Sequence, residues 1–190
     1  MSTRTEAKTE STVGYILRIS LTLLIITAVV AALLAGVNAI TKDKIAAIQA
    51  EKTARALSAV LSDGSSAAAI DFTDDSGIIT AVYESETGYA IQVAPNGFGG
   101  AVTLMVGVLK DGTVSGVSVI SHAETAGLGA VAADSTAKGE AFRGQYVGMS
   151  GTLAVDKDGG EVDSISGATI TSRAVTTGVN AALAWVAKNG

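Results

Sequence analysis

Residues 163–172, DSISGATITS, place hydroxyl side chains on both sides of a Gly167–Ala168 step, just before a segment with helical periodicity. The first turn of a helix has backbone N–H groups without intrahelical partners and a partial positive charge, and both favour a phosphate group. The small residues 167 and 168 would let such a group approach the backbone closely. Alternatively, Thr171 or Ser172 caps the helix, which is the commoner use of these residue types at a helix start. The residues alone leave both interpretations open.

The composition restricts the chemistry that this segment can serve. The chain has 190 residues, 48% of them hydrophobic, with no cysteine and a single histidine, His122. Disulfides, thiolate metal sites, iron–sulfur clusters held by this chain and multi-histidine metal sites are therefore excluded. If the protein handles electrons, it needs an organic cofactor. The net charge is −5, and acidic residues outnumber basic ones after residue 41, so binding to nucleic acid is not expected.

One uncharged segment predicts a membrane anchor. Residues 19–41 contain no charged side chain, and a helix of that length spans about 35 Å, enough for a bilayer core of about 30 Å. A cleavable signal peptide is the alternative, but its apolar region is usually only about 7–15 residues long. We therefore expect a polar tail at 1–14, a transmembrane helix at 15–41 and a single domain at 42–190.

Charge does not settle the orientation of this anchor, because basic residues flank both of its ends almost equally. The simplest topology is a single-pass protein of the cell (inner) membrane. Its short N-terminal tail would be cytoplasmic and its domain extracytoplasmic.

The remaining sequence predicts one α+β domain, with a mainly antiparallel sheet and flanking helices. A short amphipathic helix is expected at 42–61, a loop at 62–69, and a closing helix at 171–188. Lys110–Asp111–Gly112 is a hairpin signal, because glycine supplies the positive φ that tight turns need. The expected strands are 78–86, 89–94, 101–109, 114–121 and 151–155.

Residues 163–169, DSISGAT, resemble the D-x-x-[S/T]-G-A-T motif of the FMN-binding domains found in Rnf- and Nqr-type respiratory complexes. The similarity extends over residues 15–190 and is greatest to the G subunit of Rnf complexes; the Nqr C subunit is similar but usually longer. Other segments resemble landmarks of the same family in the same order: GYAIQVAPNGFGG (88–100), HAETAGLG (122–129), FRGQYVG (142–148) and SGATITSRAV (166–175).

The resemblance implies that FMN is joined through its phosphate to the hydroxyl of Thr169. A separate flavin transferase makes this bond in the family, with FAD as donor and magnesium. Residues 122–129 would pack on the flavin ring, mainly through Thr125 and Leu128, although the family commonly has proline at the position of Ala126. Residues 97–100 would form another wall, or else an ordinary glycine-rich turn. The cofactor-binding residues expected on this basis are Thr169, Asp163, Ser166, Gly167, Ala168, Ile170, Thr171, His122, Glu124, Thr125, Leu128, Gly129 and Gly99.

The function implied by the resemblance is electron relay in a membrane-bound, ion-translocating ferredoxin:NAD⁺ oxidoreductase of the Rnf type. The partners would be the other membrane and peripheral subunits, the flavin transferase and membrane lipid. No catalytic residue and no metal site are expected in this chain. A stand-alone flavinylated electron-transfer protein and an Nqr C-type subunit remain alternatives, as does a cofactor-free membrane-anchored scaffold. A hydrolase using Ser166 or Thr169 with His122 lacks a nucleophile elbow or an ordered triad.

Overall fold

The computed structural model describes residues 12–190, which begin with one long helix and continue into a sheet flanked by helices. Most of the polar tail expected at 1–14 lies outside these residues. The chain divides into two compact units between Gln49 and Ala50, and we describe each by itself.

The first unit consists of the N-terminal part of helix α1 (Thr12–Val60), whose apolar side chains are exposed from Tyr15 to Ile40. Among the described residues, α1 is the one helix long and apolar enough to cross a membrane, and none of its apolar window is buried against protein. The Thr22 and Thr41 hydroxyls donate to backbone carbonyls one turn earlier, at 2.8 Å each. Hydroxyls satisfied within the helix suit a lipid environment.

The structure differs from the sequence-based expectation at the end of the anchor. We expected a transmembrane helix to 41 and a separate helix at 42–61, but α1 runs without interruption to Val60. Residues 41–60 contain no glycine or proline and are rich in alanine and lysine, which favour helix. Nothing in the local sequence therefore ends the helix near residue 41.

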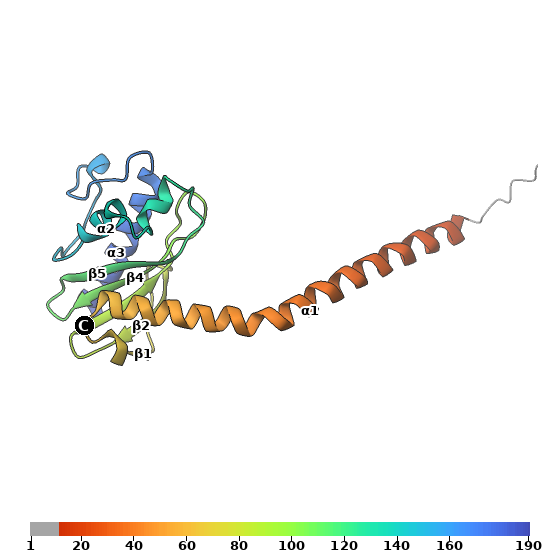
Figure 1. The fold of residues 1–190 in the computed structure, drawn as a ribbon, viewed down its shortest axis with the longest axis horizontal. Coiled ribbons are helices and arrows are strands. Elements are labelled where there is room, and N and C mark those ends of the chain that lie inside the picture. The colour runs from red at the N-terminus through yellow and green to blue at the C-terminus, as the bar shows by residue number, and fades with distance from the viewer. Residues whose placement is uncertain (1–11) are drawn as a thin grey trace, which may run out of the picture. The chain divides into compact units, whose positions relative to one another are not determined.

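The second unit is built on a five-stranded antiparallel sheet in which sequential strands are neighbours, in the order β1-β2-β3-β4-β5 (Figure 1). The hairpin expected at 110–112 joins β4 to β5, and Gly112 there has a φ of 83°. The α+β class with an antiparallel sheet is thus confirmed. The strands are β1 (Ala68–Ile70), β2 (Ile79–Glu84), β3 (Gly88–Val93), β4 (Thr103–Leu109) and β5 (Val114–Ser121).

Helical elements cover both faces of this sheet. On one face, α3 (Thr169–Asn189) buries Val175, Val179 and the other apolar residues of one side against strand residues such as Ile91 and Leu104. On the other face, the last turns of α1 contribute Leu57, Val60 and neighbouring apolar residues, which pack on Ala90, Met105 and Ile120. Burial on both faces explains why β4 is a nearly continuous apolar run rather than an alternating one.

Two local expectations were wrong. The segment expected to be a loop at 62–69 contains the start of β1. The strand expected at 151–155 is absent: Val155 makes only one isolated bridge, to Val162. The reason is a substitute partner, because the side-chain amide of Asn180 on α3 accepts from the Leu153 N–H and donates to its carbonyl, both at 2.8 Å.

A short helix, α2 (Ala137–Gly144), was not anticipated from the sequence. Thr136 is its N-cap residue, and the Thr136 side chain accepts from the Gly139 N–H. Phe142 is buried on this helix and meets Tyr146 edge-on, with ring centroids 5.7 Å apart. The part of the chain that the structure describes also contains the short 3₁₀ helices η1 (Gly64–Ser66), η2 (Gly129–Ala132) and η3 (Asp156–Asp158).

Candidate functional site

The segment 163–172 forms a loop followed by the first turn of α3. The loop turns at Gly167, whose φ of 76° lies in the left-handed region that glycine adopts without strain. Ala168 is the N-cap residue, and no side chain caps the helix within the described part of the chain. The backbone N–H groups of the first turn, which begins at Thr169, are therefore left without a side-chain acceptor.

The alternative in which Thr171 or Ser172 caps this helix is wrong. Both residues lie inside its first turn and are buried. The Thr171 hydroxyl donates to Glu124 Oε2. The Ser172 hydroxyl donates to the Ala168 carbonyl at 3.1 Å and accepts from the Ile165 N–H at 2.9 Å. These hydroxyls tie the loop and the helix to the rest of the domain.

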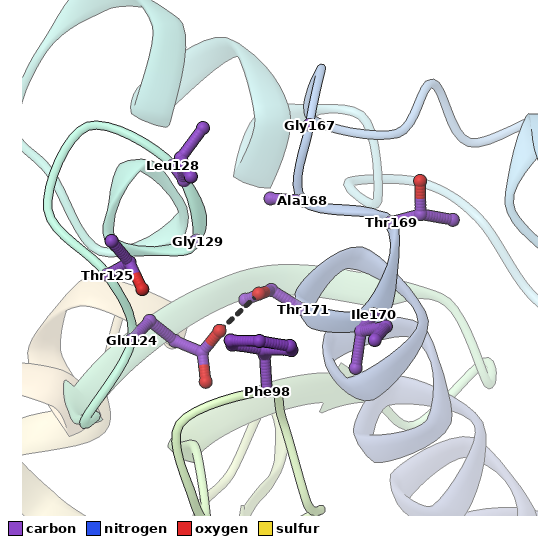
Figure 2. Close-up of a pocket in the computed structure, with 10 residues that line it drawn as sticks. All are labelled: Phe98, Glu124, Thr125, Leu128, Gly129, Gly167, Ala168, Thr169, Ile170 and Thr171. Carbon is purple, nitrogen blue, oxygen red and sulfur yellow. Dashed lines mark hydrogen bonds between the residues drawn. The ribbon is translucent and has the colours of Figure 1, made fainter.

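A cavity of about 350 Å³ opens beside the start of α3 (Figure 2). Three separate segments form it: the loop at 97–100, the loop at 122–129 and the residues 167–171. The volume falls within the range of roughly 300–1,000 Å³ that is typical of small-molecule sites. Its lining residues are Phe98, Glu124, Thr125, Leu128, Gly129, Gly167, Ala168, Thr169, Ile170 and Thr171.

Glu124 joins the three segments. Its side chain is buried, with only 9% of the residue exposed. Oε1 accepts from the Gly99 N–H at 2.9 Å, and Oε2 accepts from the Thr171 hydroxyl, the bond drawn in Figure 2. A Cβ added at Gly129 would lie 2.4 Å from both Glu124 Oε2 and Thr171 Oγ1, so glycine is required there for the loop to approach the pair.

Apolar side chains surround the opening of the cavity. Phe98, Leu128 and Ile170 are 71%, 44% and 48% exposed, respectively, and exposed apolar side chains gathered at one place are a feature of ligand and interaction sites. Thr169 is partly exposed at the same opening, and its side chain is directed away from the Glu124–Thr171 pair (Figure 2). Within residues 12–190, no side chain or backbone group forms a hydrogen bond with the Thr169 hydroxyl.

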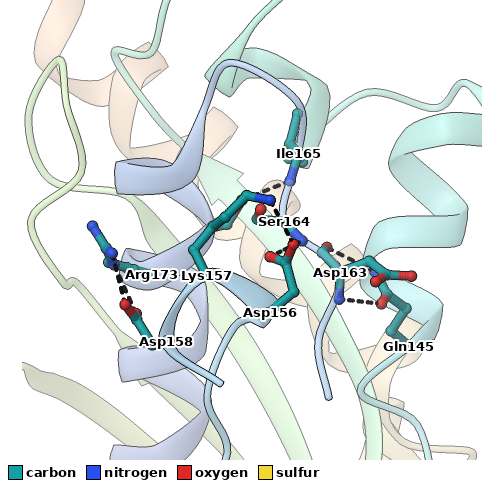
Figure 3. A network of polar contacts seen from close by, with 9 residues as sticks. Gln145, Asp156, Lys157, Asp158, Asp163, Ser164, Ile165 and Arg173 are labelled. Carbon is teal, nitrogen blue, oxygen red and sulfur yellow. Dashed lines mark hydrogen bonds and ion pairs between the residues drawn. The ribbon is translucent and has the colours of Figure 1, made fainter. Parts of the chain in front are cut away.

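A polar network supports the loop that precedes Gly167 (Figure 3). The Gln145 side chain accepts from the Asp163 N–H at 2.8 Å and donates to its carbonyl at 3.2 Å. Asp156 accepts from the Ser164 N–H at 3.0 Å, and hydrogen bonds from Ser164, followed by Lys157, hold the pKa of the Asp156 carboxyl well below its usual range. The loop is thereby fixed from two sides.

One ion pair fixes the first turns of α3 to the same region. The Arg173 guanidinium donates through Nε and Nη2 to the two oxygens of Asp158, at 2.7 Å each. This bidentate hydrogen bond lowers the pKa of Asp158. No local sequence pattern indicated this contact, because its partners are 15 residues apart. Gln145 fell within the landmark segment 142–148 but had no assigned role.

The other expected site residues do not all lie at this cavity. Gly99 contributes through its N–H to Glu124, whereas His122 is exposed and its Nδ1 accepts from the Glu124 N–H at 3.2 Å. Asp163 and Ser166 line a second cavity of about 510 Å³. In the described part of the chain, no hydrogen bond connects His122 with Ser166 or Thr169, so the hydrolase alternative gains no support.

Comparison with known proteins defines the class to which this fold and site belong. An FMN-binding domain model matches residues 97–184, which contain all three segments of the cavity. A model of the RnfG N-terminal region matches residues 14–60, nearly the length of α1. The chain therefore contains an FMN-binding domain behind an N-terminal helix of a recognised type.

Sequence comparison with individual proteins identifies the family. The G subunit of an ion-translocating oxidoreductase complex from Methanosarcina acetivorans is 31% identical over 182 residues, covering 90% of this chain and 94% of the relative. The corresponding G subunit of Aliivibrio fischeri is 44% identical over 106 residues, 54% of this chain and 50% of the relative. A Clostridium ljungdahlii protein, named as the G subunit of a proton-translocating ferredoxin:NAD(+) oxidoreductase complex, is 40% identical over 102 residues, with 52% of each chain covered.

The chain belongs to the family of G subunits of ion-translocating oxidoreductase complexes. It spans nearly the whole of the Methanosarcina acetivorans relative but about half the length of the other two. Membership of a membrane complex and the exposed apolar helix α1 together support a membrane location.

The residues of the cavity fit FMN. Phe98, Leu128 and Ile170 offer apolar surface for a flat aromatic ring system. The uncapped N-terminus of α3, with Gly167 before it, suits a phosphate, because its N–H groups have no side-chain acceptor and the helix dipole favours a negative charge.

Proposed function

We propose that this chain carries FMN bonded to Thr169 and relays electrons within an Rnf-type ion-translocating complex. The observation that supports attachment at Thr169 is the placement of its hydroxyl. It is partly exposed, has no hydrogen-bond partner among residues 12–190, and stands at an uncapped helix N-terminus on the edge of the cavity.

In the attachment reaction, FAD donates the FMN group. Thr169 Oγ1 forms a bond to the FMN phosphorus, the pyrophosphate bond of FAD breaks, AMP leaves, and the hydroxyl proton is released. The product is a phosphodiester with one negative charge, which a helix N-terminus stabilises. A flavin transferase would catalyse this reaction, with magnesium bound in the transferase.

The residues of this chain would then hold and orient the cofactor. Gly167 and Ala168 let the phosphate approach the backbone, and Phe98, Leu128 and Ile170 exclude water from the ring. Bound flavin accepts and donates one or two electrons, so it can exchange single electrons with iron–sulfur centres of other subunits. The covalent bond keeps the cofactor in place at a site that is open at one side.

The decisive experiment is the intact mass of the full chain purified from its native membrane, with a peptide map. We expect a mass increase of FMN less one water, located on Thr169. Thr169→Ala should lose this increase and Thr152→Ala, an exposed threonine outside the loop, should keep it. An unmodified parent chain from cells that contain the transferase would refute the proposal and favour a cofactor-free scaffold.

Membership of a complex needs its own measurement. Purification in mild detergent should bring down the other membrane subunits together with this chain. A flavinylated chain that purifies alone under these conditions would indicate a stand-alone electron carrier.

We further propose that the N-terminus is cytoplasmic and the FMN domain extracytoplasmic. The chain has no cysteine, so single introduced cysteines report position unambiguously. In intact cells, a membrane-impermeant maleimide should label Thr152→Cys, and it should label Thr3→Cys only after the cells are opened. The reverse pattern would place the domain in the cytoplasm.

A further inference from the structure

Glu124 is a buried acidic residue whose hydrogen bonds come only from neutral groups. Its two oxygens accept from the Gly99 N–H and from the Thr171 hydroxyl. No lysine, arginine or histidine side chain within residues 12–190 forms an ion pair with it. Both oxygens therefore act as acceptors, and neither hydrogen bond brings a positive charge to the side chain.

A carboxylate in this environment receives hydrogen bonds from protein groups, but no positive charge from the described part of the chain lies beside it to neutralise its own. Hydrogen bonds from neutral donors stabilise it without cancelling its field, and burial reduces the screening that water would provide. Glu124 lines the same cavity as Thr169. Its charge therefore acts on whatever occupies that cavity more strongly than a surface charge would.

We propose that Glu124 is a positioning residue that sets the reduction potential of the flavin in this cavity. The inference rests on the proposed function. The carboxylate holds the loop at 97–100 and the start of α3 in place, and its fixed negative charge makes it harder to add an electron to a neighbouring group. The predicted consequence is a midpoint potential lower than the same cavity would give with a neutral side chain at 124.

Glu124→Gln separates charge from geometry. The amide oxygen can still accept from the Gly99 N–H, and the amide nitrogen can donate to the Thr171 hydroxyl, which is able to accept as well as donate. Glu140→Gln is the matched control, since it removes the same charge from an exposed position on α2. Equilibrium titration of the flavinylated full chain with dithionite and redox mediators measures the midpoint potential.

We expect Glu124→Gln to shift the midpoint to a more positive value and Glu140→Gln to leave it unchanged. Equal potentials in the parent and Glu124→Gln would overturn the inference. Thr171→Val provides a second test if Glu124→Gln does not retain flavin. This variant keeps the charge and removes one donor, so the midpoint should move in the negative direction, and a positive or absent shift would count against the proposal.

The positioning role can be measured without flavin. In the apoprotein, hydrogen exchange at the Gly99 amide should accelerate in Glu124→Ala and be restored toward the parent rate in Glu124→Gln. Unchanged exchange in Glu124→Ala would refute this part of the inference. If the parent chain carries no flavin in its native membrane, the proposed function fails, whereas the exchange experiment still gives its own answer.

Discussion

Alkaline conditions should destabilise the FMN-binding domain through a single buried phenol. Tyr146 is fully buried and follows Gln145 in the sequence, and its hydroxyl is 2.8 Å from that of Thr176 on α3. Burial raises the pKa of Tyr146 to about 12, although the hydrogen bond with Thr176 opposes this shift. In the unfolded chain the same group loses its proton near the ordinary pKa of 10.0.

The direction and size of the effect follow from the two pKa values. Between pH 10 and pH 12, the unfolded chain has lost this proton and the folded protein has kept it. The unfolded state then binds fewer protons, so the free energy of unfolding falls as pH rises. The loss is at most about 1.4 kcal/mol per pH unit and amounts to about 2 kcal/mol at pH 12, where half of the folded molecules have lost the proton as well.

Tyr146→Phe removes this dependence at a small cost near neutral pH. Thr176 keeps its bond to the Ser172 carbonyl at 2.9 Å, so no buried hydroxyl is left without a partner. The cost should therefore be about 1 kcal/mol. Above about pH 11 the variant should become the more stable protein, because the penalty of the parent then exceeds this cost.

Urea unfolding of both full chains in detergent, followed by the fluorescence of the single tryptophan Trp185, measures the difference at each pH. Trp185 is buried on α3 and reports on this domain. The other titrating groups are common to both proteins and cancel in the difference. A constant difference from about pH 7 to pH 12 would refute the argument that Tyr146 is kept protonated by burial.

Three further predictions test the packing around the site. Gly129→Ala should abolish flavin loading in the intact-mass assay, because its Cβ would lie 2.4 Å from two oxygens in the cavity wall. Gly107→Ala should lower the urea midpoint, since its Cβ would lie 2.4 Å from a backbone oxygen at the end of α1, whereas Gly144→Ala, with nothing within 4 Å, should not. Arg173→Ala should raise the pKa of Asp158 toward its usual value, detectable by NMR titration of the carboxyl; an unchanged value would show that the ion pair does not form in solution.

Part of the fold was predictable because the local pattern of apolar residues fits only one type of secondary structure. Four strands and the apolar face of α3 follow from periodicity, since a residue exposed to the wrong side of a strand or helix would lose its burial. The prediction of a strand at 151–155 was wrong because of a contact between residues far apart in the sequence. Asn180, distant in sequence, satisfies the backbone of Leu153 in place of a neighbouring strand.

The candidate site shows the same division. Family membership, now confirmed, and the expectation of FMN came from ordered sequence motifs, whereas attachment at Thr169 stays a prediction. The sequence placed 122–129 and 163–172 near one cofactor only through resemblance. It did not show that Glu124 would accept a hydrogen bond from Thr171. Nor did it show that the Gln145 side chain would form hydrogen bonds with the loop before Gly167.

The sequence by itself determined that this protein has an apolar helix long enough for a bilayer and no cysteine for thiol redox chemistry, and its patterns predicted the antiparallel domain. Only the tertiary structure decided how Thr169 is presented. A hydrogen bond between residues 47 positions apart, from Thr171 to Glu124, uses the neighbouring hydroxyl and leaves that of Thr169 without a partner within residues 12–190. Helix periodicity extends over a few residues, and the pairing of buried polar groups depends on which distant segments the core brings together.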